Sequence, residues 1–317
     1  MVGSLAFVAW ILIRDKDELA AIGDVSLVSL GIFVLVQIAY LILQSYRQWI
    51  VLTRCGGEHV RVGSWLRIFL VGRLLNLVFS QAGNVYRGVQ LKSAHGVNYT
   101  DYVTLFFAFA WLSNVLNLIL AAIVVTILGS DTDLGTVGGP VALLVLAVLL
   151  IAAPFVIREL VARSPGLGRR GEWLRGRVLR LLNGSGRLLR NRRFLAEFIA
   201  SGIVAIALAS ALLYSITRSL GVDAGIGDIV LLFALLQPFT LLSITPGNLG
   251  IQESLFGAVF GAAGLGAGPG VVASAIVRVT GYVALALLAV AVGARDLRSA
   301  LAGRGSRPAA EAGPGDR

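Results

Sequence analysis

The chain has 317 residues, of which 57% are hydrophobic and only 14% are charged. Soluble domains carry about 25% charged residues, so this composition excludes an ordinary soluble globular protein and indicates a polytopic all-α membrane protein. The net charge of +10 comes mostly from arginines in short segments between apolar runs, a pattern that fixes orientation in a membrane and does not predict a nucleic-acid partner. Cys55 is the single cysteine, which excludes an internal disulfide.

The apolar segments predict the membrane-crossing helices. Residues 2–13 are too few to cross a hydrocarbon core of about 30 Å at about 1.5 Å per residue, and we expect a shortened first helix there. Five later segments have the length and composition of membrane spans. They are residues 26–50, 102–128, 140–157, 195–217 and 271–293. With the segments described next, we expect about six to eight transmembrane segments.

Two further apolar stretches are interrupted by polar residues. Residues 64–98 contain the break SQAGNVYRG, and residues 228–265 contain the break SITPGNLGIQES. Backbone that is broken at membrane depth needs partners from protein or water, because lipid supplies none. Each break is therefore either a joint at the membrane surface or part of a site within a re-entrant hairpin.

The arginines predict the orientation of the chain in the cytoplasmic membrane. Residues 158–193 hold eleven arginines and two glutamates, and we expect them in the cytoplasm as an amphipathic helix on the membrane or a solvated basic loop. The tail, 303–317, is expected to be cytoplasmic and disordered. The loop 129–139 contains acidic residues but no Lys or Arg, which places it outside. The two interrupted stretches then become hairpins that enter from opposite faces.

The order of segments suggests an inverted repeat. In both halves a span is followed by an interrupted hairpin and another span, and the two halves have opposite orientations. Inverted repeats with broken helices are a recurring plan of transporters, whose substrate site lies where the broken helices meet. We therefore predict a single transmembrane domain over residues 1–302, with repeats over about 1–128 and 140–295.

Both breaks contain groups that suit an anion. Gly83 and Asn84 lie in the first break, Gly247 and Asn248 lie in the second, and each pair precedes an apolar helical limb. If the limbs re-enter the membrane, their N-termini point free N–H groups and positive dipole ends into its interior. Such helix ends bind anions, and phosphate above all.

Charged side chains near the breaks complete the predicted site. Arg278 lies near the middle of the last span, where a charge costs at least about 2.5–3.5 kcal/mol and needs a cavity or a partner. Arg73 and Arg87 flank the first break, whereas Gln252 and Glu253 follow the second. Arg87 and Arg278 are expected to hold phosphate. Arg73 and Glu253 are expected to tune charge, although Arg73 can instead snorkel to the interface and Glu253 can simply pair with Arg278.

Uncharged polar side chains also lie within the apolar segments, and singly each is expected to join helices by hydrogen bonds. They are Asn76, Gln81, Asn114, Asn117, Gln237 and Gln252. Tyr86, Trp111 and Tyr282 are expected to pack against neighbouring helices. The sequence contains no G-x-S-x-G motif, no P-loop, no carboxylate pair and no zinc-type spacing, so we predict no catalytic residue, no metal site and no cofactor.

Three stretches and Arg278 resemble the lysylphosphatidylglycerol synthase transmembrane-domain family, also described as flippase-like integral membrane proteins. The stretches are YRQWIVLTRCGG, FSQAGNVYRGVQLK and ITPGNLGIQESLFGAVFGAAG. The resemblance covers nearly the whole chain to about residue 295, and its most specific element comprises Pro246, Gly247, Gly250 and Glu253. It implies an eight-segment helical domain with re-entrant hairpins that moves polar lipids between leaflets. Some members carry a fused aminoacyl-transferase that charges phosphatidylglycerol, and no stretch of this chain resembles that enzyme.

Five positions depart from the pattern that the resemblance implies. Asn84 stands where members commonly have an acidic residue. Ser113, Asn114 and Asn117 correspond to a Glu-Arg-x-x-Asp pattern, and Gln252 replaces an arginine. Charges of both signs are thus replaced by uncharged polar groups, which indicates that ion pairs are lost together.

These observations predict lipid translocation, with an anionic phospholipid or polyprenyl-phosphate-linked head group bound in a central polar cavity. One alternative is a secondary transporter of a small solute, whose cavity would be closed off from lipid. Another is an accessory subunit that presents lipid to a membrane transferase. The expected partners are membrane lipids, with a homo-oligomer left open, and we expect a binding protein without enzymatic activity.

Overall fold

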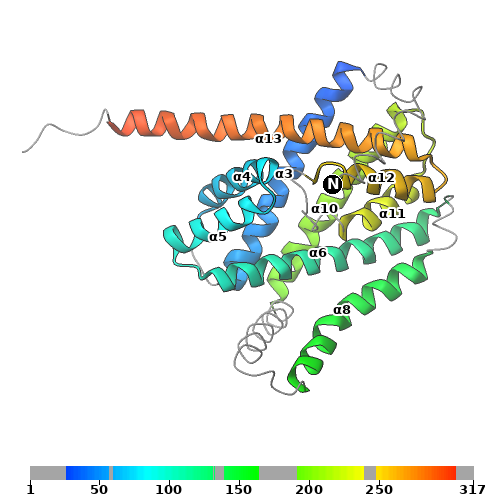
Figure 1. Ribbon diagram of the computed structural model, residues 1–317, viewed down its shortest axis with the longest axis horizontal. Coiled ribbons are helices and arrows are strands. Elements are labelled where there is room, and N and C mark those ends of the chain that lie inside the picture. Colours follow the sequence, from blue (N-terminus) through cyan, green and yellow to red (C-terminus); the bar gives the residue numbers. More distant parts are fainter. Residues whose placement is uncertain are drawn as a thin grey trace, which may run out of the picture.

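The computed structural model of the chain describes residues 26–56, 60–130, 132, 139–163, 191–238 and 248–304. All regular structure within these ranges is helical, which confirms the predicted all-α class for them (Figure 1). The helices are α3 (Leu27–Gly56), α4 (Val62–Val78), α5 (Ala82–His95), α6 (Tyr99–Leu128), α8 (Pro140–Arg163), α10 (Arg192–Ser219), α11 (Ile226–Leu236), α12 (Ile251–Ala262) and α13 (Ala267–Arg304).

Five of these helices are long and apolar enough to cross a membrane. They contain the candidate spans Leu27–Arg54, Tyr99–Leu128, Pro140–Val161, Arg192–Ser219 and Ala267–Gly293. Each coincides with one of the five predicted spans, so the chain is a multi-pass membrane protein. The predicted short helix at residues 2–13 lies outside the described residues.

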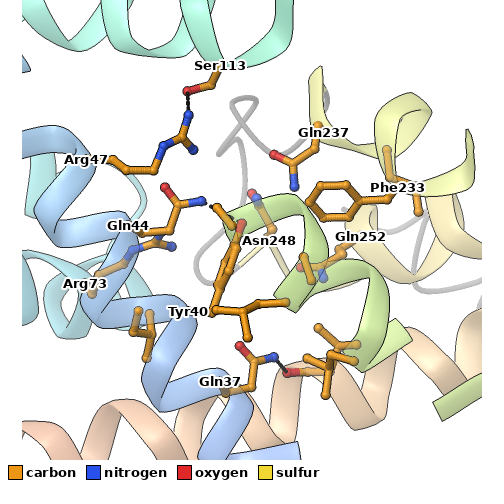
Figure 2. Close-up of a pocket in the computed structure, with 18 of the residues that line it drawn as sticks. Gln37, Tyr40, Gln44, Arg47, Arg73, Ser113, Phe233, Gln237, Asn248 and Gln252 are labelled. Atoms are coloured by element: carbon orange, nitrogen blue, oxygen red, sulfur yellow. Dashed lines mark hydrogen bonds between the residues drawn. The ribbon is translucent and has the colours of Figure 1, made fainter. Parts of the chain in front are cut away.

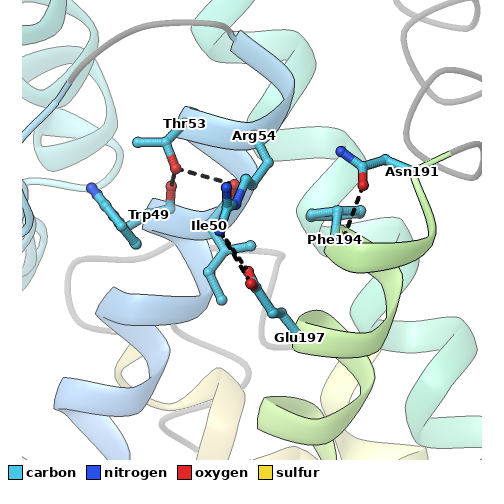
Figure 3. Close-up of polar contacts among 7 residues, drawn as sticks. All are labelled: Trp49, Ile50, Thr53, Arg54, Asn191, Phe194 and Glu197. Carbon is cyan, nitrogen blue, oxygen red and sulfur yellow. Dashed lines mark hydrogen bonds and ion pairs between the residues drawn. The ribbon is translucent and has the colours of Figure 1, made fainter.

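The helices next to the basic segment are longer than predicted. α8 continues to Arg163 and α10 begins at Arg192, so both ends of the predicted loop 158–193 are helical, while residues 164–190 lie outside the described part of the chain. The Asn191 side chain caps α10 by accepting a hydrogen bond of 3.1 Å from the Phe194 N–H (Figure 3). α13 likewise continues through 303–304, and the rest of the predicted tail lies outside the described residues.

α3 and α10 pack against each other near the centre of the molecule (Figure 1). Where α3 ends and α10 begins, Arg54 and Glu197 form an ion pair of 3.1 Å between Nη2 and Oε1 (Figure 3). Both side chains are partly exposed, so the pair contributes at most about 1 kcal/mol. Burial of apolar side chains, and not this pair, holds the two helices together.

α4 and α5 form the first hairpin, and two glycines let them approach closely. A Cβ on Gly83 would collide with the Gly72 carbonyl oxygen, and a Cβ on Gly72 would lie 2.5 Å from the Arg87 Nε. Only glycine fits such backbone contacts. Between the two helices Gln81 takes the left-handed conformation, with φ 65°.

α11 and α12 form limbs of the second interrupted stretch. They contain 11 and 12 residues, about 16–18 Å of helix. α11 begins two residues before the predicted limb 228–245 and ends at Leu236, and α12 covers most of the predicted limb 249–265. Neither helix reaches across a core of about 30 Å. Residues 239–247, which join them, lie outside the described residues.

The two hairpins lie at opposite ends of α6 (Figure 1). At its beginning, the Tyr99 ring lies against Gly88 of α5. At its end, the Ser130 hydroxyl donates a hydrogen bond of 2.6 Å to Asp228 Oδ1 in the first turn of α11. The second Asp228 oxygen accepts from the Gly225 N–H at 2.9 Å and caps that helix. These polar contacts fix α11 against α6.

The described residues form four buried apolar clusters, and α13 contributes to the two largest. One core joins Ile276 of α13 to Phe256 and Phe260 of α12. The other joins Ala284 of α13 to Phe69 of α4 and contains Leu91 of α5. α8 lies outside both cores and exposes much of its apolar surface, as a helix in contact with lipid does.

Candidate functional site

A cavity of about 390 Å³ lies between the two hairpins and is lined by every described helix except α8. Figure 2 shows Gln44, Arg47 and Arg73 on one side of it, facing Gln237 and Gln252 on the other. The polar lining consists of Gln37, Tyr40, Gln44, Arg47, Gln48, Arg73, Asn76, Asn84, Arg87, Ser113, Asn114, Asn117, Gln237, Asn248, Gln252, Arg278 and Tyr282.

Both breaks reach this cavity. Asn84 lies in the first turn of α5 and Asn248 lies just before α12, and both side chains are part of the lining. The predicted site residues Arg73, Arg87, Gln252 and Arg278 line the same cavity, and these come from four helices. Gly247 lies outside the described residues.

The backbone N–H groups of the first break are not free, which corrects the prediction that they face a ligand. The Gly83 N–H donates to Asn76 Oδ1 at 2.7 Å, and the Asn84 N–H donates to the Gln81 carbonyl at 3.0 Å. Gly83 is not part of the lining and instead serves the close packing of α4 on α5. The N-cap positions are Gln81 and Gly250, so neither asparagine caps a helix.

Glu253 forms a buried ion pair with Arg278, as one of the two interpretations of the sequence expects. Glu253 Oε1 lies 2.7 Å from Arg278 Nη2, and the two side chains are 11% and 7% exposed. Glu253 Oε2 accepts the Gly250 N–H at 2.8 Å and so caps α12. Arg278 Nη2 also donates to the Asn248 carbonyl at 3.1 Å, but its Nε and Nη1 are buried and have no partner among the described residues.

Arg87 and Arg73 lie beside the ring of Phe69. The guanidinium carbons are 4.9 Å and 5.4 Å from the ring centroid. Arg87 is buried, and its Nη2 donates to the Phe69 carbonyl at 3.2 Å, whereas its Nε has no partner within the described ranges. Arg73 is exposed and its side chain lines the cavity. Neither arginine forms an ion pair with a carboxylate of the described residues.

Arg47 of α3 is a cavity residue that the sequence did not single out. It is 2% exposed, its guanidinium lies 4.6 Å from the ring of Phe198, and its Nη2 donates to the Ser113 hydroxyl at 3.4 Å (Figure 2). A signal does exist in the sequence. Gln37, Gln44 and Arg47 recur at spacings of seven and three, which places them on one helical face inside an apolar span.

The cavity therefore has a large excess of positive charge. Four guanidinium groups line it, and within the described residues Glu253 is the one carboxylate that pairs with any of them. Charges that are removed from water are costly unless they are paired. An anion in the cavity would supply the missing partners.

Residues 1–289 match the family described as "Lysylphosphatidylglycerol synthase TM region". The chain belongs to this family. Comparisons with curated proteins and with solved structures find no match. Membership of the lysylphosphatidylglycerol synthase TM-region family, together with the five apolar helices, connects the protein to membrane lipids.

In this lysylphosphatidylglycerol synthase TM region, the five positions that differ from the residues implied by the resemblance lie close together. Asn84, Ser113, Asn114, Asn117 and Gln252 all line the cavity. The five positions at which the resemblance implies other residues thus lie around a single pocket.

Proposed function

We propose that the protein binds the anionic head group of a membrane lipid in this cavity and moves it between the two leaflets. The observation that carries the proposal is the cluster of Arg47, Arg73, Arg87 and Arg278, with one carboxylate partner in the described part of the chain. Guanidinium groups bind phosphate through directed, charge-assisted hydrogen bonds. Arg47, Arg87 and Arg278 each keep a buried Nε without a partner in the described part of the chain. The protein therefore compensates their charge incompletely, and an anion in the cavity would complete the compensation.

The mixed lining suits a lipid better than a free ion. Phe106, Phe109, Phe233 and Phe256 line the cavity beside the polar groups, and binding sites for organic ligands combine apolar walls with a few polar groups. The lipid tails would remain in the bilayer while the head group crosses. The family to which the chain belongs supports this choice.

The two hairpins would be re-entrant and enter from opposite faces, as an inverted repeat requires. Two features support this arrangement: α11 and α12 are too short to cross, and the hairpins lie at opposite ends of α6 while Asn84 and Asn248 reach the same cavity. In the orientation predicted by the arginines, α13 ends in the cytoplasm and the protein resides in the cytoplasmic membrane. Transport then follows from opening the shared cavity to each leaflet in turn.

Lipid retention tests the binding step. Arg87→Ala and Arg278→Ala each remove a phosphate donor, so each variant should retain less phosphatidylglycerol than the unaltered protein in native mass spectrometry. Arg163→Ala is the matched control, because it removes the same charge from an exposed pair with Glu159 on α8. Unchanged retention in both cavity variants would remove the proposed phosphate site.

A vesicle assay tests the movement of lipid. Purified protein is reconstituted into vesicles with fluorescent phosphatidylglycerol, and an external reductant bleaches the label in the outer leaflet. The unaltered protein and Arg163→Ala should expose inner-leaflet lipid to the reductant, whereas Arg87→Ala should do so more slowly. Bleaching that stops at the outer leaflet in every sample would contradict translocation.

A further inference from the structure

We infer that the head group in this cavity is a phosphate that carries an uncharged polyhydroxyl group, such as glycerol or a sugar, and not an amine. The inference rests on the function proposed above and specifies the substrate class of that same site. It is carried by amide groups that lack partners in the described chain and by the placement of the Glu253 carboxylate.

Three amide side chains face the cavity without a hydrogen bond to the rest of the described chain. They are Gln48 of α3, Asn117 of α6 and Gln252 of α12. Asn117 is only 6% exposed. In addition, the Oδ1 atom of Asn248 is buried and has no partner within the described residues. Buried polar groups are normally paired, so Asn117 and the Asn248 oxygen indicate a ligand with groups that match them. Gln48 and Gln252 are only partly buried and add amide groups to the same lining.

Hydroxyl groups match this lining. An amide offers two N–H donors and a carbonyl acceptor, and a hydroxyl both donates and accepts. The free amides come from three different helices and thus surround the cavity. The arginines can hold a phosphate while Asn117, Gln252 and Gln48 bind the hydroxyl groups attached to it.

An ammonium group, in contrast, finds no partner. The described lining contains no Asp or Glu. The nearby carboxylate of Glu253 is already occupied, with Oε1 on Arg278 and Oε2 on the Gly250 N–H. An amine in the head group would lie among guanidinium groups at low dielectric, where like charges repel strongly. The site therefore selects against ethanolamine and aminoacyl head groups.

The size of the cavity agrees with this substrate class. Its volume of about 390 Å³ falls within the range of about 300–1,000 Å³ that is typical of sites for small organic ligands. A bare phosphate would leave the free amides without partners.

Binding of lipids that share acyl chains but differ in head group tests the inference. The full chain in detergent is titrated with phosphatidylglycerol, phosphatidic acid, phosphatidylethanolamine and lysylphosphatidylglycerol, and separately with a polyprenyl-phosphate hexose. We expect at least one polyhydroxyl lipid to bind about tenfold or more tightly than the other three, because a site built for hydroxyl groups discriminates against analogues that lack them. Tighter binding of phosphatidylglycerol or of the polyprenyl lipid identifies the source of the head group.

The outcomes separate this inference from the proposed function. Equal binding of phosphatidic acid and the polyhydroxyl lipids overturns the inference and leaves anionic-lipid binding intact. Equal binding of lysylphosphatidylglycerol and phosphatidylglycerol overturns it as well. If phosphatidylethanolamine binds as tightly as all the others, both the inference and the proposed function fail.

Substitution of two amide residues tests whether they cause the preference for a polyhydroxyl head group. Asn117→Leu and Gln252→Leu should each lower affinity for the polyhydroxyl lipid about tenfold while affinity for phosphatidic acid stays the same. Gln252 is only partly buried, so Gln252→Leu should fold and can be measured even if Asn117→Leu does not fold. Gln90→Leu, on α5 outside the lining, is the control and should change neither affinity. Parallel losses for both lipids would assign the amides a structural role and overturn the inference.

Discussion

The arginines of the cavity differ in how the protein compensates their charge. Arg278 forms a buried ion pair with Glu253. Arg47 lies next to aromatic rings and a serine hydroxyl and has no carboxylate partner among the described residues. An arginine that contributes to folding is expected to have a carboxylate partner. A buried arginine without a carboxylate partner lowers the stability of the fold, and a bound anion offsets this loss. Replacement of a paired arginine should therefore destabilise the protein, whereas replacement of an unpaired one should not.

Replacement of Arg278 should destabilise the protein through the partner that it leaves behind. Arg278→Met strands the buried Glu253 carboxylate, and breaking such a pair costs about 3–5 kcal/mol. Thermal unfolding in detergent should therefore begin at a markedly lower temperature. The double variant Arg278→Met/Glu253→Gln removes both charges and should recover most of the loss, and a double variant as unstable as Arg278→Met would contradict the pairing.

Replacement of Arg47 should have the opposite effect on stability. Arg47→Met removes a buried cation whose Nε has no partner among the described residues, and the methionine can still pack on Phe198. Its melting temperature in lipid-free detergent should equal or exceed that of the unaltered protein, while retention of phosphatidylglycerol falls. A large loss of thermal stability would show that Arg47 serves the fold.

At the level of helices, the first hairpin depends on glycine at two facing positions. Gly72 and Gly83 bring the backbones of α4 and α5 together, and the Asn76 side chain accepts the Gly83 N–H at 2.7 Å. This contact sets the direction of α5 and so places Asn84 and Arg87 in the cavity. Helix packing of this kind depends on small residues in membrane proteins generally.

Gly83→Ala should separate α4 from α5. The added methyl group collides with the Gly72 carbonyl, and overpacking of this kind costs about 1–3 kcal/mol. Both thermal stability and lipid retention should fall, because α5 carries part of the lining. Gly63→Ala is the matched control on α4, since a Cβ there meets nothing within 4 Å. Equal stability of the two variants would rule out the close contact.

The sequence predicted the long helices well and the hairpins less well. A span is a local property of twenty or so apolar residues, and all five were confirmed. Around the second break, the limb 249–265 was predicted to within three residues, whereas the limb 228–245 can be compared only up to residue 238, because residues 239–247 lie outside the described part of the chain. Arg47 was missed because only the rotation of α3 decides whether its side chain enters the cavity or joins the arginines at the end of the span.

For the whole molecule, movement of a lipid head group through one cavity requires two hairpins that open toward opposite faces. The sequence pattern suggested this arrangement. The structure adds that residues of α4–α5 and α11–α12 line one cavity, which a head group could reach from both hairpins. The many amides of that cavity could not be predicted from single positions, because each amide taken alone is expected to form a hydrogen bond between helices.

Labelling of cysteines from outside the cell tests the orientation. In a Cys55→Ser background, a membrane-impermeant maleimide should label Asp223→Cys, next to α11, in intact cells. It should label Lys92→Cys, near the end of α5, only after the membrane is opened. Both native side chains are exposed, so access to the reagent is not limited by packing. Labelling of both positions in intact cells would contradict opposite orientation of the hairpins.

The most direct test of the head-group site is an experimental structure of the protein in nanodiscs that contain phosphatidylglycerol. The account predicts phosphate density within about 2.7–3.2 Å of guanidinium nitrogens of Arg47, Arg87 or Arg278, with the tails extending into the bilayer. A cavity that holds only water, with all ordered lipid on the outer surface of the helices, would contradict it.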